Sequence, residues 1–158
     1  MTVPPWLADE MLGRLARYLR FVGCDTLYVQ GLGDDALLAR ATADDRVILT
    51  RDRALARRAA RSLWIASPQL AEQWRSVRRA WPTLPDRLRF ERCSLCNGRL
   101  LPYRIGTTPD RENGVPTDRA AGGMALWSCD ACGHLYWEGT HTTRIQERLA
   151  RWAAEPIE

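Results

Sequence analysis

The first half of the chain alternates short apolar runs with longer segments in which apolar residues recur at helical spacing. The apolar runs lack the strict polar alternation of a half-exposed sheet, which favours parallel strands buried on both faces. The predicted strands are Val3–Ala8, Thr26–Val29, Val47–Thr50 and Leu63–Ala66. Because Pro4 and Pro5 cannot donate backbone hydrogen bonds, they shorten the first strand or restrict it to an edge of the sheet.

Helices are predicted between these strands. They cover Glu10–Val22, Asp35–Ala41 and Arg53–Ala60, and a fourth is capped by Ser67-Pro68 and carries Leu70, Trp74 and Val77. In the first helix the leucines recur on one stripe, and Gly23 is the expected stop signal. Strands that alternate with helices predict an α/β domain of three layers, in which helices cover both faces of a small parallel sheet.

The second half of the chain differs in composition. Two prolines in residues 82–85 break the preceding helix, and turn residues, aromatic residues and paired cysteines follow. We therefore divide the chain into an α/β domain at 1–81, a linker at 82–92, a zinc ribbon at 93–141 and a C-terminal helix or tail at 142–158. Residues 104–125 have the glycine- and proline-rich composition of a loop.

The cysteines indicate a metal site. Cys93 and Cys96 form one Cys-x₂-Cys pair, Cys129 and Cys132 form another, and 32 residues separate the two pairs. Four thiolates in two tight turns are the ligand set of a closed, structural zinc site. The alternatives are disulfide pairing, which is rare in the cytoplasm, and chance clustering of the cysteines. Cys24 stands alone and is predicted to pack in the core.

Charge favours an anionic partner. All 23 basic side chains are arginine, against 19 acidic ones, which gives a formal net charge of +4 and a pI near 9.0. The lack of lysine also fits a GC-rich coding sequence, but an excess of guanidinium groups suits polyanions. No run approaches the roughly 18 apolar residues of a membrane span, and the first residues lack the pattern of a secretory signal. We expect a cytoplasmic protein with no membrane partner.

Acidic residues follow three successive predicted strands. Asp9 follows the first strand, Asp34 and Asp35 lie after the second, and Asp52 follows the third. The carboxyl ends of parallel strands meet at one edge of a sheet, so these side chains are expected to converge. Carboxylates that converge bind hard cations such as Mg²⁺ or Mn²⁺, which activate water and neutralise charge on a phosphate.

Helix capping is the alternative role for the same acids. Each one precedes a predicted helix and would stabilise its amino end. The sequence pattern leaves the two roles about equally supported.

Four segments together resemble a known family. They are residues 7–20 (LADEMLGRLARYLR), 47–53 (VILTRDR), 93–98 (CSLCNG) and 129–141 (CDACGHLYWEGTH). In this order they resemble the Mut-seven C-terminal RNase domain family, over about residues 6–145. The resemblance implies a PIN-like fold, a C-terminal zinc ribbon, and a metal-dependent endoribonuclease activity on RNA.

The resemblance also implies roles for the acids. Asp9, Asp34 and Asp52 match the acidic positions that hold the catalytic Mg²⁺ or Mn²⁺, Asp35 is the alternate for Asp34, and Glu10 matches a neighbouring metal or supporting group. A fuller site of this kind has a fourth carboxylate, which no residue after Asp52 matches.

Several basic residues are candidate RNA contacts. Arg14, Arg17 and Arg20 recur on the side of the first helix away from its apolar stripe, and Arg51 and Arg53 flank the third acid. Each alone is an ordinary solvated side chain, but at the mouth of an acidic metal site they could hold phosphates, while Tyr136 or Trp137 stacks a base. The candidates are Arg14, Arg17, Arg51, Arg53 and the family-typical His141. The rival function is a non-catalytic RNA-binding adaptor with a degenerate acidic site.

Overall fold

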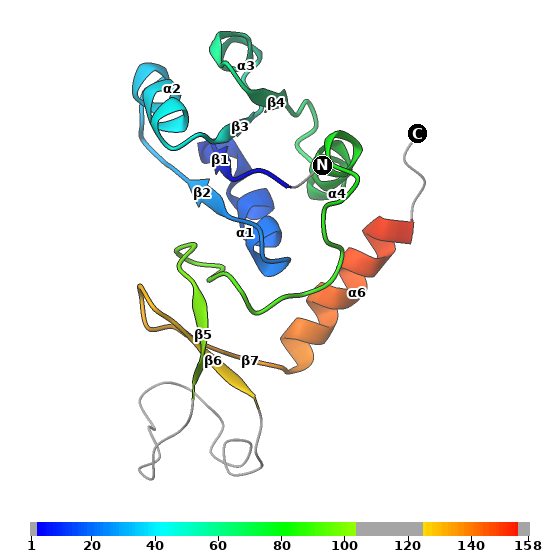
Figure 1. The fold of residues 1–158 in the computed structure, drawn as a ribbon. Helices are drawn as coiled ribbons and strands as arrows, with labels where there is room; N and C mark the ends of the chain where they lie inside the picture. Colours follow the sequence, from blue (N-terminus) through cyan, green and yellow to red (C-terminus); the bar gives the residue numbers. More distant parts are fainter. Residues whose placement is uncertain (1–2, 104–124, 155–158) are drawn as a thin grey trace.

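The computed structural model describes residues 3–103 and 125–154, and these residues form two sheets (Figure 1). The first sheet is parallel, in the order β2-β1-β3-β4, with β1 Trp6–Ala8, β2 Thr26–Tyr28, β3 Val47–Thr50 and β4 Ser62–Trp64. The second is antiparallel, in the order β5-β6-β7, with β5 Leu100–Tyr103, β6 Leu126–Cys129 and β7 Leu135–Trp137. The predicted fold class is confirmed. The loop predicted at 104–125 lies outside the described residues except for its last position.

A helix follows each strand of the first sheet. These helices are the 3-10 turn η1 Glu10–Leu12 with α1 Gly13–Phe21, then α2 Asp34–Ala43, α3 Arg53–Arg58 and α4 Leu70–Ala80; α6 Thr140–Ala154 follows the second sheet. The first predicted helix is therefore divided, because its first turn is a 3-10 turn capped by Asp9. The fourth helix has Gln69 as its N-cap instead of the predicted Ser67. None of the described helices has the length and apolar character needed to cross a membrane.

Alternate residues of the buried strands pack against different helices. Trp6 and Leu49 belong to the core shared with α1, α4 and α6, whereas Leu7 and Ile48 pack with α2 and α3. All four side chains are buried. The strand period of two therefore produces the three layers, and burial on both faces explains the continuous apolar runs.

The first strand lies inside the sheet. β1 pairs with both β2 and β3, so the predicted restriction to an edge is wrong, while the predicted shortening is correct. The two prolines lie just before the paired residues. The carbonyl oxygen of Pro5 accepts a hydrogen bond from the backbone amide of Val47 at 3.0 Å. A proline at this position therefore removes no hydrogen bond from the ladder.

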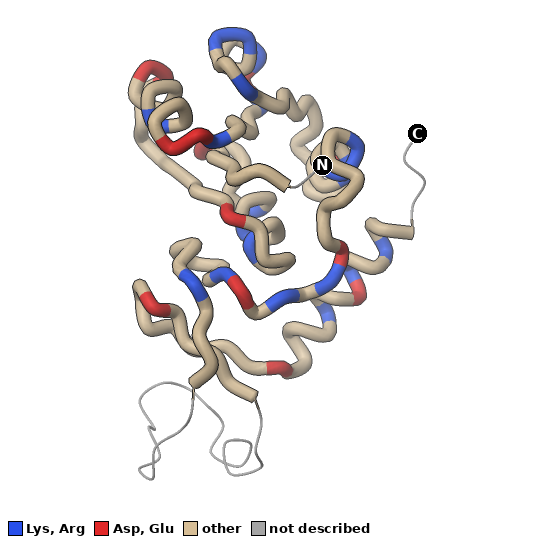
Figure 2. The backbone as a smooth tube through the Cα atoms, viewed as in Figure 1, with Lys and Arg blue, Asp and Glu red and all other residues tan. Residues whose placement is uncertain are grey.

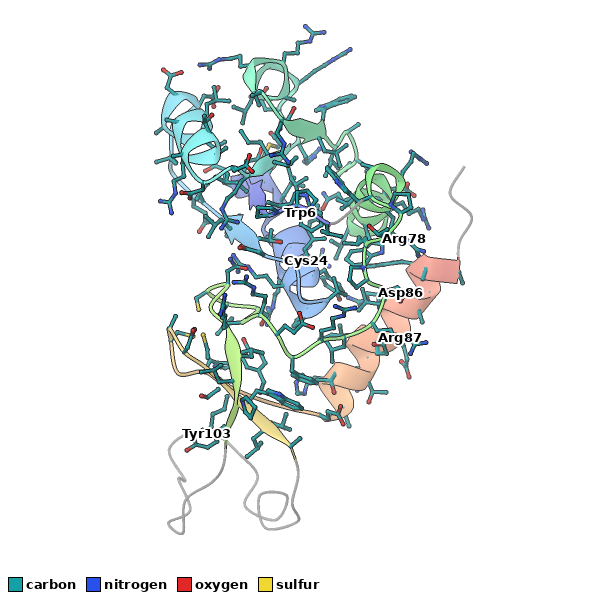
Figure 3. The ribbon with its side chains drawn as sticks, viewed as in Figure 1. Trp6, Cys24, Arg78, Asp86, Arg87 and Tyr103 are labelled. Carbon is teal, nitrogen blue, oxygen red and sulfur yellow. The ribbon has the colours of Figure 1, made fainter. Side chains whose placement is uncertain are left out.

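The C-terminal helix packs on the first domain. Trp152 of α6 is buried, with its ring centroid 5.0 Å from that of Tyr18 and 5.8 Å from that of Trp74. Figure 3 shows Trp6 and Cys24 in the interior of the same domain. Burial raises the pKa of the Cys24 thiol to about 12, and the side chain packs in the core as predicted.

A buried arginine attaches the second sheet to the first domain. Arg20 is 5% exposed, its Nε donates to the carbonyl oxygen of Thr26 at 2.8 Å, and its Nη1 donates to those of Ser94 at 3.2 Å and Leu95 at 3.0 Å. The predicted solvated position of Arg20 is wrong, because the first cysteine turn covers this part of α1. Hydrogen bonds to three carbonyl groups compensate the guanidinium for its lost water.

Asn97 makes a second connection between the two sheets. Its φ is 70°, in the left-handed region that asparagine tolerates better than most residues. Its Oδ1 accepts from the backbone amide of Thr26 at 2.9 Å, and its Nδ2 donates to Oδ1 of Asp25 at 2.8 Å. Burial acts to raise the pKa of Asp25, but hydrogen bonds from Arg46 and Asn97 bring it below its ordinary value.

We expect Asn97→Gly to lower the free energy of unfolding by about 1–3 kcal/mol with unchanged zinc content, because it leaves a buried backbone amide without its acceptor. Glycine keeps the left-handed backbone, so the loss isolates the side-chain hydrogen bonds. Chemical denaturation at fixed zinc concentration measures the difference. Asn97→Ala is the comparison, and its strained φ should make it less stable than the glycine variant. Wild-type stability for Asn97→Gly would show that this contact does not hold the two parts together.

Candidate functional site

The four cysteines predicted to bind zinc converge in the second sheet. Their Sγ atoms all lie within 4.8 Å of one another, with 3.7 Å between Cys93 and Cys132 and 3.4 Å between Cys96 and Cys129. A tetrahedral zinc with bonds of about 2.3 Å needs sulfur–sulfur distances of about 3.8 Å. A disulfide would need about 2.05 Å, and all four cysteines are free. The donor set fits a closed zinc site and not the disulfide alternative.

Two glycines shape the cysteine turns. Gly133 directly follows the second cysteine pair and has a φ of 72°, a left-handed conformation that glycine adopts without strain. A Cβ atom at Gly98 would lie 2.6 Å from Sγ of Cys129, so only glycine permits this approach. The backbone amide of Gly98 also donates to Sγ of Cys96 at 3.4 Å. These turns bring backbone and sulfur together as expected around a thiolate site.

Hydrogen bonds distribute charge unevenly over the cysteine cluster. Burial acts to raise the pKa of Cys93, but hydrogen bonds from the Tyr136 hydroxyl and from backbone amides bring it down to about 7. Burial and neighbouring sulfurs raise the pKa of Cys96 to about 12. Zinc binding must therefore displace protons. A zinc ion with four thiolates has a formal charge of about −2, and the buried Arg20, which interacts electrostatically with Cys93 and Cys96, offsets part of it.

The acids that follow the first three strands share a second location. Asp9, Glu10, Asp34 and Asp52 line one cavity of about 110 Å³ at the carboxyl ends of the strands, and Asp35 does not line it. This is the edge where an open parallel sheet binds ligands. The volume exceeds the roughly 30 Å³ that one water molecule occupies in the liquid, so there is room for a partly hydrated cation. The structure therefore brings together the three predicted acids, with Glu10 as a fourth.

Thr50 links two of these acids. Asp9 is 5% exposed, and its Oδ1 accepts from the backbone amide of Met11 at 2.9 Å while its Oδ2 accepts from the Thr50 hydroxyl. The same hydroxyl oxygen accepts from the backbone amide of Asp52 at 2.8 Å. Sequence reasoning did not assign Thr50 a role, although a polar residue at the end of an apolar strand, directly before Arg51, was the available signal.

Arg58 distinguishes the two acids that follow β2. Its Nη1 lies 3.3 Å from Oδ2 of Asp34, and its Nη2 pairs with Asp35. The Asp35 side chain is 90% exposed and does not line the acidic cavity, whereas Asp34 does. Arg58 therefore holds the start of α2 against α3 and partly neutralises Asp34. This contact joins residues far apart in sequence, and no local pattern indicated it.

Helix capping, the alternative role, applies to two of the three acids. Asp9 caps η1, and Oδ1 of Asp52 accepts from the backbone amides of Ala54 at 2.7 Å and Leu55 at 3.1 Å. Asp34 is itself the first residue of α2, whose N-cap is Gly33. Capping uses only Oδ1 of Asp52. Within the described residues, Oδ2 of Asp52 accepts no hydrogen bond, and neither does Oδ1 of Asp34. Capping and cation binding are therefore compatible at this cavity.

The cysteines and the acids differ in how closely they gather. In the described parts of the chain, the cysteine cluster is the one group of three or more Cys, His, Asp or Glu side chains with its ligand atoms positioned around a common metal position. The acids line one cavity, but several of their oxygens already accept hydrogen bonds from protein donors, and in the described residues their ligand atoms do not meet around a common metal position. The donor chemistry fits a hard cation, which the acids could hold once Asp34 releases Arg58.

Arg51 and Arg53 flank Asp52 in sequence and contact Trp64, but neither arginine lines the acidic cavity, and nor does Trp64. The guanidinium of Arg53 is 5.2 Å from the ring centroid of Trp64, and the Trp64 Nε1 donates to the carbonyl oxygen of Arg51 at 3.2 Å. Trp64 is 43% exposed at the carboxyl end of β4. Trp64 was not among the candidates identified from the sequence, since the exposure of one aromatic ring is not visible in the sequence pattern.

The other RNA-binding candidates lie elsewhere. Arg14, Arg17 and His141 line a larger cavity, of about 440 Å³, together with Trp137, and none of them lines the acidic cavity. Of the two rings suggested for base stacking, Tyr136 has its hydroxyl bonded at the cysteine cluster, 3.1 Å from Sγ of Cys93. Its role in supporting the cluster leaves Trp137 as the better candidate.

Comparison with known proteins identifies one family. The sequence model described as the Mut7-C RNAse domain matches residues 4–149, which is nearly the whole chain. No curated protein and no solved structure gives a significant match.

Proposed function

Because the chain belongs to the Mut7-C RNase domain family, we propose that it is a metal-dependent endoribonuclease that hydrolyses RNA phosphodiester bonds at the acidic cavity. Membership of this family supports the ribonuclease activity. The observation that carries the location is that Asp9, Asp34 and Asp52, which follow three different strands, line the same cavity. Mg²⁺ or Mn²⁺ bound there would activate water and neutralise charge on the phosphate.

Each side chain of the cavity has a distinct task in this proposal. Asp9 is held rigidly by Thr50 and by η1, so its position is fixed before a cation arrives. Asp52 keeps one oxygen on the helix amides and directs the other toward the cation. Asp34 exchanges Arg58 for the cation, and Glu10 orients water or the cation from the rim. Carboxylates held in this way require little rearrangement during the reaction.

Arginines next to the acids hold the substrate. Arg51 and Arg53 flank Asp52 in sequence, and the exposed Trp64 beside them offers a face on which an RNA base can stack. Guanidinium groups bind phosphate oxygens in pairs and stabilise charge that develops at phosphorus. The cysteine cluster, remote in sequence and closed in geometry, holds a structural zinc and takes no part in the chemistry.

The rival function is a non-catalytic RNA-binding adaptor. The observation that favours it is the ion pair between Arg58 and Asp34, which neutralises part of the acidic cavity without any cation. An adaptor would keep this ion pair permanently, whereas a nuclease must release it when the cation binds.

We expect zinc-loaded protein to cut single-stranded RNA internally when Mn²⁺ is added and not when it is omitted. Products are separated on denaturing gels, and zinc content is measured in both samples so that loss of the structural metal is not mistaken for loss of the catalytic one. Intact RNA at every Mn²⁺ concentration, together with retained RNA binding, would establish the adaptor instead.

A further inference from the structure

We propose that the larger cavity between α1, the second sheet and α6 is a separate binding site for a nucleotide of single-stranded RNA, away from the point of cleavage. This inference rests on the proposed function for the identity of the polymer. The cavity's volume of about 440 Å³ lies within the range of about 300–1,000 Å³ that is typical of ligand sites. It is bounded by parts of the chain that are distant in sequence, from Arg14 to Ile145.

The charge of this cavity selects an anion. Among the described residues that line it, none is acidic, and five are arginines. Arg89 lies 3.6 Å from Glu91, and Arg92 lies 3.4 Å from Asp25, so these two are partly neutralised. The remaining three, Arg14, Arg17 and Arg144, are exposed and form no ion pair within the described part of the chain.

The three arginines without an ion pair lie on two helices, α1 and α6. Arg14 and Arg17 are three residues apart on α1 and therefore share a face. Arg144 lies near the start of α6, whose first turn carries the positive end of the helix dipole. Figure 2 shows basic positions on α1, on the segment before β5 and on α6. A phosphate between the helices would meet guanidinium groups from both.

Aromatic rings in the same cavity suit a base. Trp137 is half-buried, and its ring centroid lies 6.1 Å from that of His141 in an edge-to-face arrangement. His134 and Tyr136 form a second such pair at 4.9 Å, but the Tyr136 hydroxyl is bonded at the cysteine cluster, so Trp137 is the ring proposed to stack on the base. Stacking on aromatic rings is how proteins bind the bases of single strands without reading their sequence. Phosphate-binding arginines next to aromatic rings therefore indicate single-stranded nucleic acid instead of a simple inorganic anion.

The position of this site relative to the acidic cavity supports a common substrate. Glu10 lines the acidic cavity and Arg14 lines the larger cavity. Both residues belong to the continuous η1–α1 segment. Four residues of 3-10 and α-helix rise by about 6–8 Å along the axis. A strand of a few nucleotides would therefore reach from the acids past Arg14 to Trp137. The larger cavity would then bind the part of the RNA that extends beyond the cleaved bond.

The test compares two double variants that remove equal charge. Arg14→Ala/Arg17→Ala changes the cavity, and Arg79→Ala/Arg151→Ala changes exposed arginines on α4 and α6 that do not line it. Binding of a fluorescent oligouridine of about twelve nucleotides to zinc-loaded protein is measured by anisotropy without Mg²⁺ or Mn²⁺, at several salt concentrations. We expect the cavity variant to bind about tenfold more weakly than the control variant, with a salt slope smaller by about 1.4, or about 0.7 for each lost phosphate contact.

A third variant tests the base contact. Trp137→Ala should weaken binding at least about fivefold without changing the salt slope, because stacking involves no counterion release. Equal affinities and slopes for the cavity and control double variants would overturn the proposal, even if the protein cleaves RNA. RNA binding that depends on the cavity in a protein that never cleaves would support this binding site and refute the nuclease, so the two failures are distinguishable.

Discussion

Cys93→Ser is expected to abolish zinc binding and to unfold the second sheet, because it removes one of four ligands that converge within 4.8 Å. Apparent free energies of structural zinc binding are about 10–16 kcal/mol in small zinc domains, as large as the whole stability of most proteins. Since Arg20 and Asn97 attach this sheet to the α/β domain, the damage should extend to the melting of the whole protein. Elemental analysis and thermal melting measure the two effects.

Cys24→Ala is the matched control for the zinc site. It removes a buried cysteine that takes no part in the cluster, so about one equivalent of zinc should remain and stability should fall by only about 1 kcal/mol. Full zinc content and wild-type melting in Cys93→Ser would contradict the assignment.

The proposed zinc site also predicts how the stability of the protein depends on pH. Because the ligands bind as thiolates and the pKa of Cys96 is raised to about 12 without metal, protons compete with zinc. The stability that zinc contributes is therefore present at neutral and higher pH and is lost as the pH falls.

Asp52→Asn is expected to reduce RNA cleavage by about 10²-fold or more while leaving folding and RNA binding nearly unchanged. The substitution removes the charge that would hold the cation, and asparagine caps helices about as well as aspartate, so α3 should keep its two amide hydrogen bonds. Single-turnover cleavage with Mn²⁺, thermal melting and anisotropy measure the three properties.

Asp45→Asn is the control for this substitution. Asp45 is an exposed aspartate on the surface, with a φ of 49° that asparagine also adopts, and it does not line the acidic cavity. If Asp52→Asn cleaves as fast as Asp45→Asn, then Asp52 only caps its helix and the adaptor function gains support.

The elements of the α/β domain could be predicted because their signals are local. The apolar runs around Leu7 and Ile48 are continuous since helices cover both faces of the sheet, and the cysteine spacing alone predicted the cluster. The placement of acids after strands also required only chain order and the geometry of parallel sheets.

What the sequence did not reveal depends on contacts between distant residues. Arg20 has the spacing of a solvated arginine, and its burial arises only because residues 94 and 95 fold over α1. Thr50 and Arg58 join side chains that the chain separates by more than twenty residues. The assignment of Arg14 and Arg17 to a cavity distinct from the acids likewise required the positions of the second sheet and α6.

The rate of single-turnover RNA cleavage as a function of Mn²⁺ concentration tests the central claim most directly, with wild type and Asp34→Asn compared on the same zinc-loaded preparations. The proposed site predicts a rate that rises from zero and saturates in wild type, and a requirement for at least about tenfold more Mn²⁺ in Asp34→Asn, because one ligand charge is lost. A rate that does not depend on Mn²⁺, or one with the same dependence in both proteins, would contradict a catalytic cation held between the strands by Asp9, Asp34 and Asp52.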